Sequence, residues 1–411
     1  MNKNIKLAVA GAVLALSASA ANAGIIIPAG DWTVDIGGNV NSFYTSTKHS
    51  GSQRTTSADD TTQSIQTGLL PSSFGIGAKT RQNDLDVAFQ FSFWTGSNAN
   101  GGDNLNVGSG GTSNGGLGYS SLNIRQSYLT FGDKSWGSFL VGRNLGLFGS
   151  DAILSDMTLL GVGSHAGNIG SSTLGRIGSG YLYADWKAQI AYTTPNFNGF
   201  EVSAALTEAT GQLDQSNMGV EAKASYSFAA NDVTGKIWVG GKDQKIQTAT
   251  TAGVGNGAAA AASAPVGPFA EHDSRAWEIG AKAGAAGFDL VGYYYDGKNA
   301  DGSVGQAINT YTSTTAGFVQ TDNKGGYVQA TYVLPTKTKL GVSWGHNTIE
   351  KAGFHEGKRE ASIVGLYHPL TKHLNVVAEY NHLDVESLSV NTAAQTEGKS
   401  KTMSLGAILF F

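Results

Sequence analysis

The stretch Asp86-Val-Ala-Phe-Gln-Phe-Ser-Phe-Trp94 decides the fold, because apolar and polar side chains alternate along it with a period of two. One face carries a valine and three phenylalanines, and the other carries aspartate, glutamine and serine. Such alternation is typical of a β-strand with one face in apolar surroundings. The same period recurs to the end of the chain, whereas a helical period is weak and confined to 151–160. The sequence therefore predicts an all-β protein.

Sixteen strands are predicted from this alternation, and their length favours a membrane barrel. Many run for about ten residues, as a tilted strand needs to cross a bilayer, whereas strands of a soluble sandwich average about five or six. The predicted strands are 31–44, 73–79, 86–95, 121–131, 136–143, 181–194, 199–207, 218–228, 233–242, 274–284, 288–295, 325–334, 339–346, 359–368, 373–382 and 400–411.

The connections between these strands alternate in length. Short turns such as 229–232 and 285–287 are followed by long polar loops such as 96–120 and 144–180. Short turns on one side and long loops on the other are the pattern of a transmembrane antiparallel β-barrel, and an even strand count places both chain ends on the short-turn side. Counts from about 14 to 18 fit the same pattern.

The composition agrees with this prediction and excludes several kinds of site. Charged residues make up 14% of the chain, against about 25% in soluble domains, as expected where outward side chains meet lipid. The chain has no cysteine, which excludes disulfides, cysteine-ligated metals and thiol catalysis. It has a net charge of −4 and no basic stripe, so nucleic acid is not an expected partner.

Residues 1–23 have the three parts of a secretory signal peptide. Lys3 and Lys6 precede the apolar core LAVAGAVLAL at 7–16, and the small-residue site Ala21-Asn22-Ala23 follows. Ten apolar residues are too few to span a bilayer of about 30 Å. We therefore expect a leader at 1–23, a single domain at 24–411, and export into the envelope of a Gram-negative type of cell.

Several stretches, in order along the chain, carry a family resemblance. They are Arg125-Gln-Ser-Tyr-Leu-Thr-Phe-Gly132 with Trp136-Gly-Ser-Phe-Leu-Val-Gly-Arg-Asn144, then Asp151-Ala-Ile-Leu-Ser-Asp156-Met, Tyr192-Thr-Thr-Pro-Asn-Phe-Asn-Gly-Phe200, Tyr332-Val-Leu-Pro-Thr-Lys-Thr-Lys-Leu340 and the terminal Phe411. Together these stretches resemble the general porins of Gram-negative outer membranes, in particular the β-proteobacterial type. The resemblance covers the mature chain apart from its loops.

The resemblance implies a multi-pass protein of the outer membrane, surrounded by lipid and lipopolysaccharide. Such porins are homotrimers with a water-filled pore in each subunit, through which small hydrophilic solutes and ions diffuse. The third loop folds inward and narrows the pore, and its acidic residues face basic residues of the wall. The resemblance also implies that Phe411 is part of the signal read by the barrel-insertion machinery.

Loop 144–180 is the expected third loop. It contains apolar residues, such as Phe148 and Ile153, that a solvated loop would not need, and packing against the inner wall explains them. The expected constriction residues are the loop acids Asp151 and Asp156 with the basic residues Arg125, Lys187, Arg143 and Arg176. Lys223 and Lys236 also point inward by alternation. Each of these could instead be an ordinary solvated or structural residue.

The chain departs from the family pattern at several of these positions. Ser73 and Thr194 stand where wall arginines are expected, and Leu159-Leu160 replaces an expected acid. The set of fixed charges around the pore is therefore thinner than is usual in the family.

Other functions fit the sequence less well. The match Gly111-Thr-Ser-Asn-Gly115 to the Gly-x-Ser-x-Gly pattern lies in the long polar loop 96–120 and not between a strand and a helix, and no metal-binding histidine pair occurs. We therefore expect no enzyme activity, metal or cofactor. A substrate-selective channel remains an alternative, although inward aromatics such as Phe43, Trp94 and Trp238 are scattered. A blocked barrel serving as an adhesin or an enzyme is a weaker one, because sixteen strands enclose an aqueous channel.

Overall fold

The computed structural model describes residues 24–54, 60–97, 123–164, 172–209, 216–249, 269–300, 319–387 and 394–411. The expected leader 1–23 lies outside these ranges. Within them, the chain is almost wholly β-structure.

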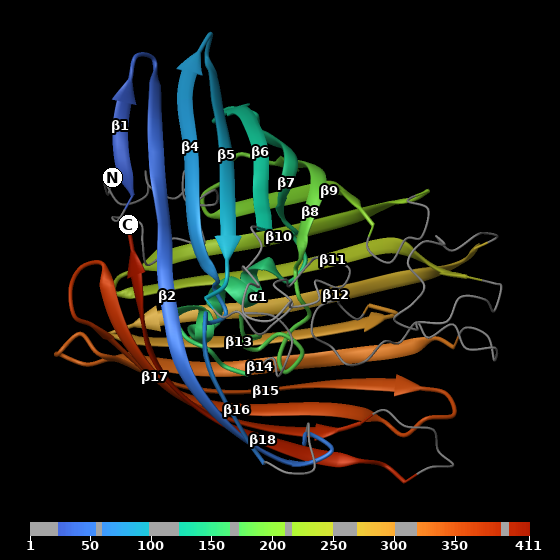
Figure 1. Cartoon of the computed structure of the whole chain (residues 1–411). Helices are drawn as coiled ribbons and strands as arrows, with labels where there is room; N and C mark the ends of the chain where they lie inside the picture. Colours follow the sequence, from blue (N-terminus) through green and yellow to red (C-terminus); the bar gives the residue numbers. More distant parts are fainter. Residues whose placement is uncertain are drawn as a thin grey trace, which may run out of the picture.

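Sixteen antiparallel strands form one closed ring (Figure 1). Each pairs with the next along the chain, and the last pairs with the first. The predicted barrel of sixteen strands is therefore confirmed. The strands are β2 (Trp32–Gly51), β4 (Ser72–Gln82), β5 (Leu85–Thr95), β6 (Asn123–Asp133), β7 (Gly137–Leu145), β8 (Trp186–Thr193), β9 (Phe200–Glu208), β10 (Met218–Ala230), β11 (Val233–Ala249), β12 (Phe269–Ala285), β13 (Phe288–Lys298), β14 (Thr321–Val333), β15 (Lys339–Lys351), β16 (Gly357–Pro369), β17 (Leu374–Glu386) and β18 (Glu397–Phe410).

Two short strands that the sequence did not predict complete the sheet at β2. β1 (Ile25–Ala29) pairs with the first residues of β2, on the edge that β18 continues. β3 (Thr61–Gln66) pairs with the last part of β2, on the edge that β4 begins. Both edges of this long strand are thus covered along most of its length, which leaves few backbone groups unpaired.

The two faces of the wall differ as the alternation predicted. On β10, Val220 is 52% exposed on the outer face, whereas the adjacent Glu221 is 2% exposed on the inner face. Val328, Val342 and Val364 continue the apolar outer face across β14, β15 and β16. An apolar outside and a polar inside are what a barrel in lipid requires.

The short turns join the strands at the end of the barrel where the chain termini lie close together (Figure 1). Asn83 and Asp84, with φ of 50° and 61°, form a two-residue turn, and Ala286 and Gly287, with φ of 50° and 85°, form another. Positive φ at both positions matches the type I′ turn, whose twist suits adjacent antiparallel strands. The predicted arrangement of the termini is therefore present.

The sequence placed the far ends of several strands too early. β11 continues to residue 249 instead of 242, and β15 continues to 351 instead of 346. These extensions carry cross-strand ion pairs, such as Arg275 with Asp243 at 2.9 Å and Lys324 with Glu350 at 2.7 Å. Charged pairs continue the sheet beyond the apolar belt, where the alternation of apolar and polar residues no longer marks a strand.

The predicted start of the sixth strand, at residue 181, is wrong. Tyr181, Leu182, Tyr183 and Ala184 are all buried, and β8 begins only at Trp186. These four residues belong to the segment between β7 and β8, which also contains α1 (Ser150–Ser155) and a 3-10 turn at Met157–Leu160. Both helical elements overlap the stretch 151–160 that has a weak helical period. Neither of them, nor any other described helix, is long and apolar enough to cross a membrane.

Candidate functional site

The segment between β7 and β8, residues 146–185, lies against the inner wall of the barrel, and we call it the interior loop. Its residues 165–171 are outside the described ranges. α1 is drawn within the ring of strands in Figure 1, and Tyr327 of β14 donates a hydrogen bond to the carbonyl oxygen of Ala152 in α1 at 2.8 Å. Phe148 and Ile153 are buried in a cluster with aromatic side chains of the wall. These contacts explain why the loop carries apolar residues.

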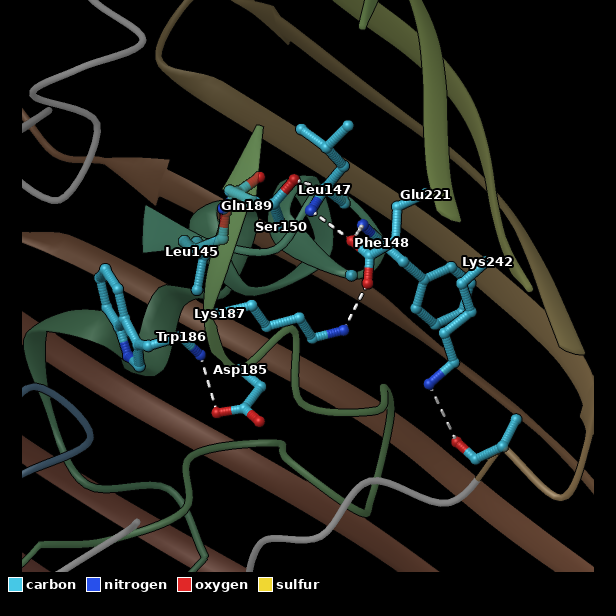
Figure 2. A network of polar contacts seen from close by, with 12 residues as sticks. Leu145, Leu147, Phe148, Ser150, Asp185, Trp186, Lys187, Gln189, Glu221 and Lys242 are labelled. Atoms are coloured by element: carbon cyan, nitrogen blue, oxygen red, sulfur yellow. Dashed lines mark hydrogen bonds and ion pairs between the residues drawn. The ribbon is translucent and has the colours of Figure 1, made fainter. Parts of the chain in front are cut away.

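Glu221 of β10 fixes the start of the interior loop (Figure 2). Its Oε2 accepts hydrogen bonds from the backbone N–H groups of Leu147 at 2.6 Å and Phe148 at 3.0 Å. Its Oε1 forms an ion pair with Lys187 of β8, whose side chain is 6% exposed. Lys187 therefore points inward, as alternation predicted, but it contacts the carboxylate that anchors the loop.

Two further glutamates of the wall bind the loop in the same way. Glu278 of β12 accepts hydrogen bonds from the backbone N–H of Gly149 at 2.8 Å and from a tyrosine hydroxyl at 2.8 Å. Glu379 of β17 accepts from the backbone N–H groups of Val162 and Gly163, both at 2.7 Å, and from a tyrosine hydroxyl at 2.6 Å. Buried carboxylates are tolerated where they accept hydrogen bonds, so these residues anchor the loop to two separate parts of the ring.

Asp151 of α1 lies between two lysines of the wall. Its carboxylate forms ion pairs with Lys223 of β10, at 2.8 Å, and with Lys236 of β11. Burial would raise the pKa of Asp151, but the two ammonium groups outweigh burial and hold this pKa below its ordinary value. An acid on the loop thus faces basic residues of the wall, although Lys223 and Lys236 were the weaker of the basic candidates.

Asp156 is engaged within the interior loop itself. The residue is 3% exposed, and its carboxylate accepts hydrogen bonds from the backbone N–H and hydroxyl of Thr158, at 2.9 and 2.7 Å, and from the hydroxyl of Tyr181, at 2.7 Å. It caps the 3-10 turn that follows. Among the described residues, it forms no ion pair with a wall lysine or arginine.

Two of the candidate arginines, Arg125 and Arg143, belong to strands of the wall. Arg125 of β6 is 6% exposed, with its guanidinium 4.9 Å from the ring centre of Trp94 and 5.9 Å from that of Trp186. Arg143 is partly exposed near the end of β7, opposite Ser127.

Arg176 is fully buried within the interior loop. Its Nη1 donates to the carbonyl oxygens of Ser179 and Ala361, both at 3.2 Å, and its guanidinium lies 6.0 Å from the ring centre of Tyr327. Since Ala361 is on β16, this arginine joins the loop to the wall. Burial lowers its pKa.

A second segment, residues 67–71 between β3 and β4, packs on the part of the interior loop around residues 161–163 and Thr173, which we call its tip. The backbone N–H of Leu69 donates to the carbonyl oxygen of Gly161 at 2.9 Å, and that of Thr173 donates to Gly68 at 3.2 Å. The Asn41 amide oxygen on β2 in turn accepts from the Gly68 N–H at 2.9 Å. The tip is therefore fixed from the side of the ring opposite β10.

Sequence reasoning missed the three anchoring glutamates as functional residues. The available signal was a carboxylate at an inward strand position in a chain with few charges, as at Glu278 and Glu379. That signal does not tell a solvated lumen residue from one that binds a loop distant in sequence. No group of three or more histidine, aspartate or glutamate residues is arranged to hold a metal ion in the described part of the chain.

Comparisons with known proteins agree with this architecture. A family model described as "Gram-negative porin" matches residues 9–388. Among solved structures, the outer membrane channel DcaP of Acinetobacter baumannii superposes with a TM-score of 0.61 at 14% identity, covering 95% of this chain and 100% of that one.

Two other similar structures are an anion-selective porin from Comamonas acidovorans and the trimer form of OmpT, an outer membrane protein of Vibrio cholerae. The first has a TM-score of 0.56 at 13% identity, covering 92% of this chain and 100% of that one. The second has a TM-score of 0.55 at 14% identity, covering 92% and 99%. Identities this low show a shared fold alone. No curated protein sequence matches the chain.

Proposed function

As a member of the Gram-negative porin family, this chain is a multi-pass channel protein of the outer membrane, and we propose that small hydrophilic solutes and ions cross it by passive diffusion. One observation carries the proposal: an acidic residue of the interior loop, Asp151, faces Lys223 and Lys236 of the wall. A barrel of sixteen strands is wide enough to leave an aqueous channel beside such a loop. Fixed opposite charges at a narrow place orient polar solutes and discriminate between ions by sign.

Within this proposal, the candidate residues divide into two groups. Asp151, Lys223 and Lys236, which retain some exposure on the lysine side, set the field at the constriction. Asp156, Arg125, Lys187, Arg143 and Arg176 act indirectly, by holding the interior loop and the adjoining wall in place. The buried positions of most of the second group support this division, because a charge covered by protein contacts solutes poorly.

Assembly is also proposed from family membership. We expect a homotrimer in contact with outer-membrane lipid and lipopolysaccharide, delivered with a leader at 1–23 and inserted by machinery that reads Phe411. No catalytic role is assigned to any residue, and the protein is proposed to be a non-enzymatic channel without a cofactor.

Single-channel recording in a planar lipid bilayer tests the proposal. Purified full-length protein in potassium chloride should give stepwise openings in groups of three, with current proportional to voltage. A correctly folded trimer that adds no conductance to the bilayer would contradict the channel function.

A further inference from the structure

Three lysines lie next to one another on the inner faces of β10, β11 and β12. Lys236 of β11 is directly opposite Lys282 of β12 in the strand register, and Lys223 extends from β10 on the other side of β11. Paired residues on adjacent strands point to the same face of a sheet. Since Lys236 contacts the interior loop, Lys282 also points inward. We call Lys223, Lys236 and Lys282 the lysine triad.

The positive charge of the triad is only partly balanced. Asp151 pairs with Lys223 and Lys236, whereas Lys282 is exposed and, within the described residues, forms no ion pair. The half-buried Glu201 of β9 also lies near Lys223 and Lys236, and the buried Glu278 of β12 lies near Lys223. Lys282 is therefore the member of the triad whose charge no ion pair balances in the described part of the chain. Like charges directly opposite each other are unfavourable, so an anion between Lys236 and Lys282 would relieve a repulsion that the wall contains.

Resting on the function proposed above, we propose that the lysine triad is a binding station for small solutes that carry a carboxylate. Asp151 supports this chemistry, because its carboxylate is held by two members of the triad. As part of the interior loop, Asp151 competes with a solute for Lys223 and Lys236. Lys282 supplies an ammonium group that Asp151 does not occupy. The side chains of Lys223 and Lys236 are 16% and 21% exposed, so water in the lumen reaches the station.

The station is expected to be weak, which suits a channel. Ammonium groups in contact with water gain little from each ion pair. A channel site must attract a solute and still release it quickly. Weak binding would appear as saturable slowing of ion flow rather than as tight retention.

The test is inhibition of chloride current by succinate, measured with the reconstituted trimer in a planar bilayer. Succinate should reduce the current in a saturable way, and uncharged dimethyl succinate should not. Lys282→Gln should raise the half-effective succinate concentration by about two- to fivefold, the effect of one exposed charge. Asp151→Asn should lower the half-effective concentration, because the competing carboxylate loses its charge.

Lys298→Gln is the matched control, since Lys298 is an exposed lysine on the outer face of β13, and it should behave as wild type. Unchanged succinate inhibition in Lys282→Gln would overturn the proposal, as would stronger inhibition by inorganic phosphate than by succinate. Normal chloride channels that succinate does not affect would contradict the binding site proposed here and leave the proposed channel function intact. Absence of chloride channels in the wild type would instead contradict the proposed function.

Discussion

At the scale of single residues, the two acids of the interior loop have different surroundings. Asp151 pairs with two partly exposed lysines, and we propose that its charge acts where solutes pass. Asp156 is enclosed by Thr158 and Tyr181 of the same loop. From sequence alone, both acids were expected to face the pore, because the family resemblance implies that acidic residues of the third loop line the constriction. The contacts now move the expected electrostatic role to Asp151.

Replacing Asp151 with asparagine should shift ion selectivity toward anions. The change leaves Lys223 and Lys236 without their carboxylate, and we expect the chloride-to-potassium permeability ratio to rise by roughly two- to fivefold. Asp156→Asn should change this ratio less. Reversal potentials in a potassium chloride gradient compare the two variants directly. A larger shift in Asp156→Asn than in Asp151→Asn would contradict the assignment.

The effect of Asp151 should not depend on pH between 7 and 5. Its pKa lies below the ordinary value, which is about 3.9 for aspartate. A carboxylate with a lowered pKa contributes its stabilising charge above the ordinary pKa and loses it only as pH falls through the lower one. The difference in reversal potential between wild type and Asp151→Asn should therefore be the same at pH 7 and pH 5. A difference that has largely vanished at pH 5 would show that Asp151 titrates in that range.

At the scale of elements, the interior loop is held by buried carboxylates rather than by apolar packing alone. Glu221, Glu278 and Glu379 lie on three separate strands and accept hydrogen bonds from five backbone N–H groups of the loop. Short hydrogen bonds from backbone donors to carboxylates are among the stronger kinds. This arrangement indicates a loop with a fixed position in the lumen.

Replacing Glu379 with alanine should loosen the tip of the interior loop. The change leaves the N–H groups of Val162 and Gly163 and one tyrosine hydroxyl without their acceptor, at about 1–3 kcal/mol for each buried group. We expect larger fluctuations of the open-channel current, with the trimer still formed. Glu397→Ala, at an exposed position on β18, is the control. Equal current noise in both variants would show that Glu379 does not restrain the loop.

The sequence predicted the strands better than the contacts between the loop and the wall. A period of two follows from one apolar face, so all sixteen ring strands could be found where lipid meets the wall. The strand prediction was wrong at residues 181–184, because these residues are buried on all sides. It also ended one strand too early, at residue 242, because ion pairs replace apolar residues beyond that point. The partners of Glu278 and Glu379 in the interior loop lie more than a hundred residues away in the chain, so no local pattern identifies them.

At the scale of the whole molecule, closing the barrel depends on one seam. β18 pairs with β2 over residues 39–51, and β1 continues the same edge over residues 32–36. Phe411 lies where these two strands meet. Its backbone N–H donates to Gly38 at 3.1 Å, and its carbonyl oxygen accepts from the Gly38 N–H at 2.9 Å. A side chain at Gly38 would collide with Ser73 and with the Phe411 ring, which makes glycine necessary at this close approach.

Deleting Phe411 should therefore reduce the yield of assembled protein far more than it alters the pore. The deletion removes two backbone hydrogen bonds at the seam, and in lipid an unpaired edge is costly because no water replaces the lost partner. It also removes the residue proposed to be read during insertion. Heat-modifiable migration on denaturing gels measures the folded fraction, and single-channel conductance measures the pores that do form. Phe411→Tyr is the control, since it keeps the backbone and the ring and should assemble normally. A normal folded yield after deletion would contradict both roles, whereas a normal yield with altered conductance would place Phe411 at the pore.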